Sequence, residues 1–297
     1  MEFGNIPLWF VLIIASAVAL GFYDICKKYA VLNNQVMPVL FFATLSGTLF
    51  FLICLMVSGQ FVTAVRCTKI EFFALLLKSL LVTGSWICAY YSLRELPISI
   101  VMPIRATSPL WTLFGAVLLY HEIPNFQQGV AMLLIFSGYY LFSILGREEG
   151  ISFVHHRGVH LIILATILGA ASGLYDKYLL NVCQIPLWTV QFYFSVDLVF
   201  ILGLICLITR YHRKRQYIFH WRWSIPCIGV LLIIADSLYF YAVSLPDIHI
   251  SILAVLRRCS CLITFFAGVF LFKERNLWKK SWVLLLIFAG VVLLALA

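Results

Sequence analysis

Long apolar segments recur along this chain, and short polar connections separate them. The ten segments span residues 6–29, 36–57, 71–93, 98–119, 126–145, 158–180, 186–208, 224–244, 248–271 and 281–297. Each has about 17–25 residues, the length that a helix needs to cross a bilayer. Because irregular backbone cannot face lipid, the pattern predicts ten transmembrane helices.

The first half of the chain recurs in the second half, shifted by 152 residues. Residues 21–24 (GFYD) match residues 173–176 (GLYD), and residues 133–138 (LLIFSG) match residues 285–290 (LLIFAG). Five is an odd number of helices, so the two copies must lie inverted in the membrane, with a substrate site between them near the midplane. We therefore predict an all-α integral membrane protein with ten transmembrane helices in two inverted five-helix repeats. The predicted boundaries are 1–145 for the first repeat, 146–157 for the inter-repeat loop and 158–297 for the second repeat.

Composition supports a membrane protein. The chain is 63% hydrophobic and only 11% charged, with a mean hydropathy of +1.03, whereas soluble domains carry about 25% charged residues. The net charge of +9 comes mostly from Lys and Arg in short loops, which is the usual pattern for membrane insertion and does not indicate a nucleic-acid partner. We expect a multi-pass protein of the plasma (cytoplasmic) membrane, with the lipid bilayer as its main partner.

Arg105 lies inside the fourth segment, and Arg257 occupies the equivalent position of the second repeat. An Arg near the centre of a membrane helix costs roughly 2.5–3.5 kcal/mol on insertion scales, so the charge should face a partner or a cavity. A guanidinium suits carboxylate or phosphate groups. We predict that Arg105, Arg257 and the adjacent Arg258 bind substrate. Pro103 and Pro109 on either side of Arg105 should kink its helix. The alternative is that these Arg residues form structural ion pairs.

Three acidic residues within the segments are predicted to act in coupling or gating: Asp236, Asp24 and Asp176. Asp236 has no acidic counterpart in the first repeat. It either neutralises Arg257 or Arg258, or serves as a proton-coupling carboxylate. Asp24 and Asp176 lie in the duplicated GFYD and GLYD stretches with Lys residues nearby, so anchoring ion pairs are the alternative.

Two further charged residues receive no predicted function. Lys78 should extend along its helix to place its ammonium group in the interface. Asp197 lies on a different helix face from Gln191 and is given no role.

Aromatic side chains on the third and eighth segments approach the Arg-bearing helices. We predict that they line the cavity, with ordinary packing as the alternative. The predicted substrate-binding residues of this kind are Trp86, Tyr90, Tyr239 and Tyr241.

No catalytic or metal-binding motif is evident. The chain has no HExxH or GxSxG sequence, and its seven His and nine Cys residues show no metal-ligand spacing. We therefore expect no enzyme activity, no catalytic residue, no metal and no cofactor. An ATP-binding motif is also missing, so energy would come from an ion gradient or from exchange.

Several repeated features resemble the ten-helix, EamA-like branch of the drug/metabolite transporter superfamily. They are Pro38 and Pro186 at the start of the second helix of each repeat, Pro97-Ile98-Ser99 leading to Ser108-Pro109, Glu122 or Glu274, and Gly138 or Gly290. The resemblance implies small-molecule transport by alternating access, with helices 1–4 and 6–9 around a central cavity. It also implies that helices 5 and 10 lie at the periphery, with a homodimer interface there as one option.

The resemblance leaves two points open. It implies that both termini are cytoplasmic, whereas the distribution of Lys and Arg places them outside. Many relatives carry Arg in the second helix of a repeat, where this chain has Ala43-Thr44 and Gln191. The basic residues on two helices resemble the phosphate-binding arrangement of plastid phosphate translocators, but carboxylates would suit Arg equally.

We predict a secondary transporter of a small anionic or zwitterionic metabolite that works by rocking its two halves around Arg105 and Arg257. The alternatives are a flippase for lipid-linked substrates, a membrane-embedded enzyme, and a scaffold subunit in which both Arg residues are fully paired inside the protein.

Overall fold

The computed structural model describes residues 8–108, 110–111, 114–115, 118, 125–148, 153–179, 183–212, 218–243, 257, 260–272 and 277–296. Within those ranges the structure is helical with no strand. Its helices are α1 (Leu8–Val31), α2 (Val36–Val57), α3 (Phe61–Val65), α4 (Lys69–Glu95), α5 (Ile98–Ala106), α7 (Phe126–Glu148), α8 (Arg157–Lys177), α9 (Leu187–His212), α10 (Ser224–Val243), α12 (Ser260–Phe272) and α13 (Leu277–Leu296).

Each of the ten predicted segments corresponds to one of these helices, which confirms the all-α membrane fold. By length and composition, α1, α2, α4, α8 and α9 qualify as membrane spans among the described residues. The short helix α3 between α2 and α4 was not predicted. It follows a turn at Gly59, where φ is +70°, a conformation that glycine adopts readily.

Local sequence sets the ends of α4. Thr68 and Glu71 form a capping box at its first turn, in which each side chain accepts a hydrogen bond from the other residue's backbone N–H. At the other end, the Nζ atom of Lys28 donates to the carbonyl oxygens of Leu93 and Leu96 at 2.7 and 2.5 Å. Lys28 therefore satisfies carbonyl groups that a helix end leaves unpaired.

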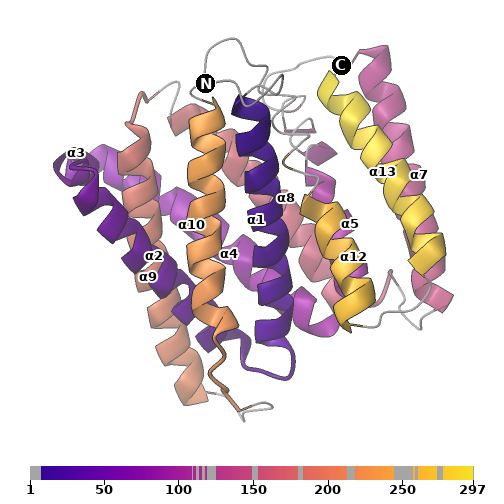
Figure 1. Cartoon of the computed structure of the whole chain (residues 1–297), viewed down its shortest axis with the longest axis horizontal. Helices are drawn as coiled ribbons and strands as arrows, with labels where there is room; N and C mark the ends of the chain where they lie inside the picture. The colour runs from indigo at the N-terminus through magenta and orange to yellow at the C-terminus, as the bar shows by residue number, and fades with distance from the viewer. Residues whose placement is uncertain are drawn as a thin grey trace.

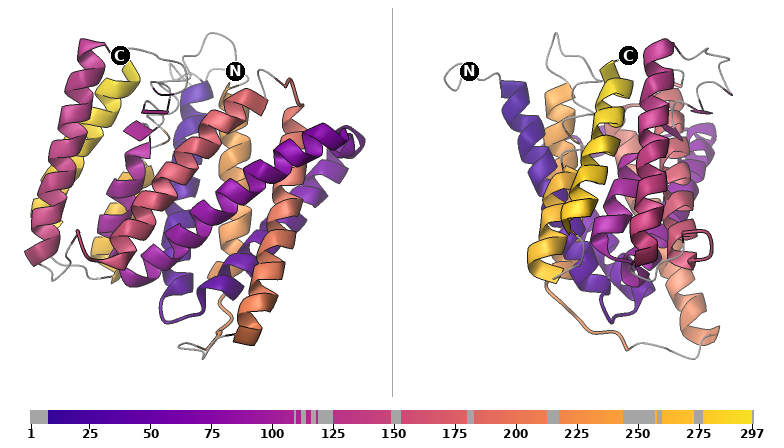
Figure 2. Two further views of the ribbon diagram at one scale, coloured as in Figure 1. Left: turned by 180° about the vertical axis from the view of Figure 1, so that it is seen from behind. Right: turned by 90° about the vertical axis from the view of Figure 1, so that its right-hand side faces the viewer.

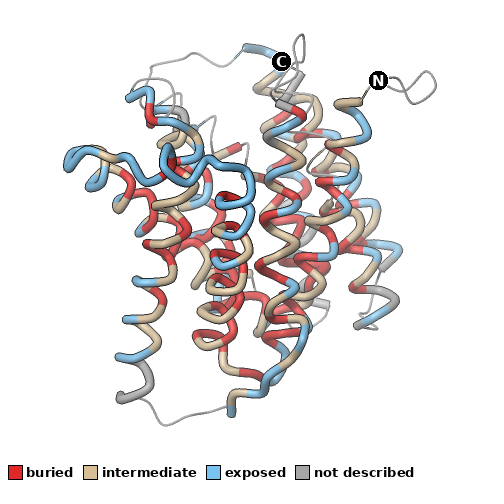
Figure 3. The backbone as a smooth tube through the Cα atoms, turned by 60° about the vertical axis from the view of Figure 1, so that its left-hand side comes forward, coloured by how far each residue is buried: buried red, intermediate tan, exposed pale blue. Residues whose placement is uncertain are grey.

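The surface of the bundle is apolar and its interior holds polar groups. Large hydrophobic side chains such as Val57, Ile70 and Phe200 are exposed, and exposed residues follow the outer faces of the helices (Figure 3). Buried residues include many Ser and Thr side chains, together with Asp24, Lys27 and other charged groups. This distribution is the one expected when lipid rather than water surrounds the protein.

Helices of one repeat pack mainly against helices of the other, and the packing has two-fold character. Helix α1 lies along α10, and its equivalent α8 lies along α4, the equivalent of α10. In the same way, α2 packs on α10 while α9 packs on α4. Figure 1 shows α1 and α10 on one face, and Figure 2 shows α4 and α8 on the other. The cores of the two repeats are therefore shared.

A serine fixes each of the two equivalent crossings. Ser16 of α1 donates to the carbonyl oxygen of Ala235 on α10, and Ser85 of α4 donates to that of Ala165 on α8, both at 2.7 Å. Hydrogen bonds of this kind stabilise helix pairs in membranes, where the hydrophobic effect contributes little to helix association.

Helices α7 and α13 pair at one edge of the bundle (Figure 1). Gly138 of α7 lies against the side chain of Ile287, and Gly290 of α13 lies against that of Ile135. These two contacts are equivalent, because Gly290 and Ile287 each follow their counterparts by 152 residues. The matching sequences LLIFSG and LLIFAG thus pack against each other across the pseudo-two-fold axis.

The tightest crossing joins α2 and α10 at Gly47 and Gly229. A Cβ atom on Gly229 would overlap the backbone atoms of Ala43 and Gly47. Small residues allow such close approach in membrane helices. This crossing holds the two repeats together beside the cavity described below.

We expect Gly229→Ala to destabilise the protein, because the new methyl group meets backbone rather than a movable side chain. Overpacking of this kind costs about 1–3 kcal/mol, so the melting temperature in detergent should fall by about 2 °C or more. Gly173→Ala is the matched control, since a Cβ atom there meets nothing within 4 Å. Equal melting of the two variants would show that the crossing tolerates a side chain.

Candidate functional site

A cavity lies between α2, α4, α9 and α10. Its polar lining comes from Thr44 and Thr48 of α2 and from Gln191 and Ser195 of α9. None of the described residues that line it carries a charge. The cavity therefore offers hydroxyl and amide groups, which suit a neutral polar surface of a ligand.

Aromatic rings form another part of the cavity wall. Tyr23 of α1 and Trp86 and Tyr90 of α4 line it, and Trp86 packs edge-on against Phe194 with 6.0 Å between ring centroids. Trp86 and Tyr90 thus lie where the sequence analysis placed them, whereas Tyr239 and Tyr241 lie outside this cavity.

Tyr239 and Tyr241 have different surroundings. The guanidinium of Arg257 lies over the ring of Tyr239 at 4.3 Å from its centroid, so Tyr239 supports a basic residue. Tyr241 is 55% exposed on the outside of the bundle, because the turn of α10 directs its side chain away from the helices that surround the cavity.

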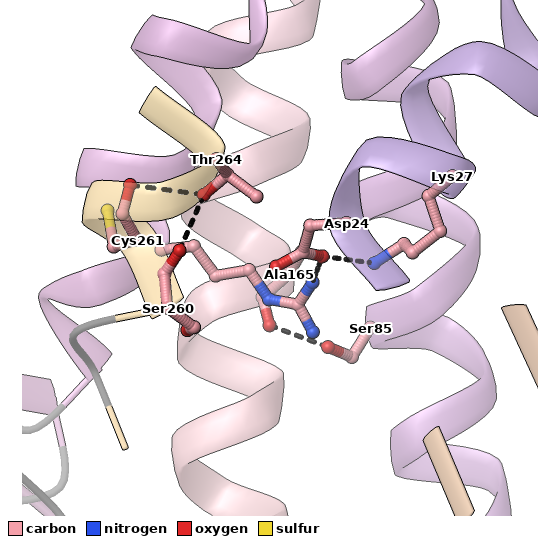
Figure 4. A network of polar contacts seen from close by, with 8 residues as sticks. Asp24, Lys27, Ser85, Ala165, Ser260, Cys261 and Thr264 are labelled. Carbon is pink, nitrogen blue, oxygen red and sulfur yellow. Dashed lines mark hydrogen bonds and ion pairs between the residues drawn. The ribbon is translucent and has the colours of Figure 1, made fainter. Parts of the chain in front are cut away.

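A cluster of charged residues begins directly behind Tyr23 and Tyr90. Lys27 is 1% exposed, and its Nζ atom lies over these two rings at 4.4 and 5.0 Å from their centroids. Asp24, one helical turn before Lys27, accepts from the same Nζ atom at 3.2 Å. Figure 4 shows this pair beside the contact of Ser85 with Ala165. This contact is the anchoring ion pair that the sequence left as the alternative to a gating role for Asp24.

Arg105 joins this cluster from α5. Its Nη1 atom lies 3.8 Å from Asp24, which is an ion pair but too long for a hydrogen bond. The helix stops just after Arg105, since α5 ends at Ala106 and Thr107 bonds back to Ile104 through both its N–H and its hydroxyl. Pro103 lies within α5, and the helix continues past it to Ala106, so the kink expected at Pro103 stays a prediction, while Pro109 lies outside the described residues.

Arg257 contributes the third cation of the cluster. Its Nη2 atom donates to Asp236 of α10, so Asp236 does neutralise Arg257, one of the two options that the sequence left open. Tyr23 interacts electrostatically with Asp236 as well as with Asp24 and Arg105, so both halves of the cluster lie near Tyr23. Arg258 lies outside the described residues.

A second ion pair, partly buried, links α4 to α8. Lys78 is 7% exposed, lies 2.5 Å from Asp176 and sits over the ring of Phe194, which lines the cavity, at 4.9 Å from its centroid. The prediction that Lys78 extends to the membrane interface was wrong. Its helix face points toward α8 and not toward lipid, and the carboxylate of Asp176 compensates its charge there.

One buried acid was given no role from the sequence. Asp197 of α9 is 7% exposed and accepts a hydrogen bond from Ser79 at 3.2 Å. The only sequence signal was an acid within an apolar segment, and its surroundings depend on the rotation of α9 against α4.

Metal binding finds no support in this part of the chain. The described residues contain no group of three or more His, Cys, Asp or Glu side chains that could hold a metal ion. The candidate site thus consists of a neutral cavity and an adjacent charge cluster, with Tyr23 and Tyr90 belonging to both.

Comparison with known proteins identifies the fold family. The model of the EamA-like transporter family matches residues 7–144. Residues 7–144 therefore carry the pattern of the EamA-like transporter family. This family is part of the drug/metabolite transporter superfamily, as the repeated motifs predicted. EamA members are membrane transporters rather than enzymes.

A solved structure described as "Crystal structure of protein" covers 97% of this chain and 97% of its own length, with a TM-score of 0.65 and 12% identity. At that identity the likeness concerns the fold alone, and it extends over both halves of the EamA-like chain. No curated protein matches this chain.

We expect Asp24→Asn to destabilise the protein strongly, because Lys27 and Arg105 lose the carboxylate nearest to them. Breaking a buried ion pair by removing one partner costs about 3–5 kcal/mol. Asp24→Asn/Lys27→Met should recover part of the lost melting temperature, since it also removes the uncompensated ammonium. A double variant that melts no higher than Asp24→Asn would contradict this pairing.

Proposed function

We propose that this EamA-like transporter moves a small anionic or zwitterionic metabolite across the plasma membrane by alternating access. The observation that carries the proposal is the excess of positive charge beside the cavity. Among the described residues, Lys27, Arg105 and Arg257 form ion pairs with two carboxylates, those of Asp24 and Asp236. The described part of the cluster therefore has one uncompensated formal positive charge in the membrane interior, which an anionic group of a substrate would balance.

Arg105 is the best-placed residue to receive that anionic group. Its side chain is 29% exposed, and the nearest carboxylate oxygen lies 3.8 Å away. A guanidinium has five N–H donors, so a carboxylate or phosphate could replace the loose contact with Asp24 by two short hydrogen bonds. The Nε atom of Arg257 is buried and has no hydrogen-bond partner among the described residues, which gives the second repeat a donor as well.

The cavity suits the remainder of a small polar molecule. Small-molecule sites combine apolar walls with a few polar groups that fix the orientation of the ligand, and this cavity has such a lining. Thr44, Gln191 and Ser195 supply hydrogen-bonding groups, while Trp86 and Tyr90 supply flat apolar walls. An amino group on the substrate would find Asp24 or Asp236 close to the basic residues, which is why zwitterions belong to the proposed class.

Alternating access is supported by unequal ion pairing of equivalent residues. In the first repeat, Asp24 pairs with Arg105. The equivalent pair in the second repeat would be Asp176 with Arg257, but Asp176 pairs with Lys78 and Arg257 with Asp236. The equivalent residues Asp24 and Asp176, and likewise Arg105 and Arg257, thus have different partners in the two repeats, as expected when each repeat adopts one of two conformations.

The partners that hold the second repeat have no charged equivalents. Lys78 corresponds to Val230, and Asp236 corresponds to Gly84. In the opposite-facing state the repeats would exchange conformations. Asp176 would then leave Lys78 and pair with Arg257, while the contact between Asp24 and Arg105 would open.

Anion binding can be tested by thermal stabilisation of the purified protein with a panel of carboxylates, phosphates and amino acids. A ligand of the native state should stabilise it by about 2.7 kcal/mol at 100 times its dissociation constant. Stabilisation should disappear in Arg105→Ala and Arg257→Ala but remain in Arg66→Ala, which changes an exposed Arg outside the cluster. The proposal fails if only lipid-linked compounds stabilise the protein, or if the ligand acts equally on all three variants.

The exchange of ion pairs can be tested by hydrogen–deuterium exchange. In Lys78→Met/Asp236→Asn, Asp176 and Arg257 lose their present partners and should pair with each other. Deuterium uptake should then rise at one end of the bundle and fall at the other. Adding Arg257→Gln should abolish this opposed change. Uptake that rises uniformly at both ends would indicate simple destabilisation and would contradict the two-state interpretation.

A further inference from the structure

Asp197 differs from the other acids inside the bundle. Asp24, Asp176 and Asp236 each lie within ion-pair distance of a Lys or Arg. Asp197 is 93% buried yet has no such partner among the described residues, and its hydrogen bond comes from the neutral hydroxyl of Ser79. This carboxyl group is therefore buried without a compensating cation.

The elements around Asp197 supply no ready source of positive charge. Helix α9 packs against α2, α3 and α4. Neither α2 nor α3 contains a charged residue, and the one titratable side chain of α2, Cys54, is exposed. Helix α4 contributes Ser79 and, at the next position, Lys78, which is held by Asp176.

Two further titratable groups lie near Asp197, and both are neutral in their ordinary state. Tyr193 belongs to α9 itself and interacts electrostatically with Asp197. Cys67 lies in the connection between α3 and α4, where burial, with the nearby acids Glu71 and Asp197, raises the pKa of its thiol. Neither group supplies a positive charge to the carboxyl group.

An ionised carboxylate in such a place costs several kcal/mol, because one hydroxyl cannot replace its hydration shell. The neutral acid avoids most of this cost and gains an O–H donor. A helix pair that needed only a polar contact could use Ser79 with a backbone carbonyl, as Ser85 does with Ala165. Acids buried inside membrane proteins usually mark ion or proton pathways.

We propose that Asp197 is a proton-binding site of this transporter, loaded in the conformation described and emptied when α9 moves. The inference rests on the proposed alternating-access function. A proton from water on one side forms the O–H bond of the Asp197 carboxylic acid. When the α4–α9 interface opens to water on the other side, that bond breaks and the proton returns to solvent.

The position of Asp197 links this event to the cavity. Ser195 and Leu198, close to it in the chain, line the cavity, whereas Asp197 itself faces α4. A movement of α9 that reshapes the cavity must therefore alter the contact between Asp197 and Ser79. Asp236, the coupling candidate chosen from the sequence, already has its charge balanced by Arg257.

The test is infrared spectroscopy of the full-length protein in lipid, with the proton itself as the ligand. At neutral pH, wild type should show the carbonyl stretch of a protonated carboxylic acid, and Asp197→Asn should lose it. Asp176→Asn is the control and should keep the band, because it removes an acid paired with Lys78. Ser79→Ala retains the acid but removes its hydrogen bond, so the band should move to higher frequency.

The same variants give a second measurement in the pH dependence of melting. The unfolded chain releases the Asp197 proton in the ordinary acidic range, about pH 4. A native state that keeps this proton therefore loses stability as pH rises above that range. The melting temperature of wild type should fall between about pH 5 and 8 more steeply than that of Asp197→Asn.

A band that is absent from wild type, or that survives in Asp197→Asn, would overturn the proposal. Release of the proton is tested in Lys78→Met/Asp236→Asn, where the band should weaken if the opposite-facing state is populated. Suppose that deuterium uptake in this variant rises at one end of the bundle and falls at the other, while the carbonyl band keeps its full strength. That result would contradict the proposal that movement of α9 releases the proton from Asp197. If no anion stabilises wild type but the band is present, the substrate class fails while the proton site stands.

Discussion

The constraint on which this structure depends is the cost of an uncompensated charge inside a membrane. Burying each ion without a partner costs several kcal/mol of desolvation free energy, and the bundle contains many charged side chains. Most are compensated by partners on another helix or one turn away: Lys27 by Asp24, Lys78 by Asp176, and Arg257 by Asp236. These pairs join α4 to α8 and α10 to the residues before α12, so the same interactions that compensate the charges also set which helices touch. The charge cluster is thus part of the architecture as well as the candidate site.

Two kinds of helix–helix crossing hold the helices together around the buried charges. At Gly47 and Gly229 the backbones of α2 and α10 almost touch, which brings the cavity wall together on one side. At Ser16 and Ser85 the helices are joined by hydrogen bonds to backbone carbonyls, which satisfy polar groups that lipid could not. Packing and polar pairing therefore act at different places along α1, α4 and α10, and the cavity lies between them.

Much of the fold could be predicted from the sequence because the signals are long and repeated. The ten apolar segments predicted the helices. The repeat at a shift of 152 residues explains why the contacts between α7 and α13 are symmetric. The partners of individual charges could not be predicted, since they depend on helix rotation by tens of degrees. Lys78 was expected at the interface and lies inside, Tyr241 was expected inside and lies on the surface, and Asp197 was given no role. The position of Trp86 and Tyr90 at the cavity could be predicted from their place on the third segment. The cavity-lining role of Thr44 and Gln191 could not, because the sequence marked them only as positions where relatives carry Arg.

The contact between α7 and α13 has a consequence for how such a chain can be assembled. Gly138 receives Ile287 as Gly290 receives Ile135, so the surface that each repeat presents there is complementary to its own inverted copy. A single five-helix unit inserted into the membrane in both orientations would already possess this contact without any further change. Covalent linkage of the two repeats then frees each half to vary alone. Lys78 and Asp236 are examples, because each is present in one repeat and has no charged equivalent in the other, whereas the contacts between α7 and α13 are the same in both.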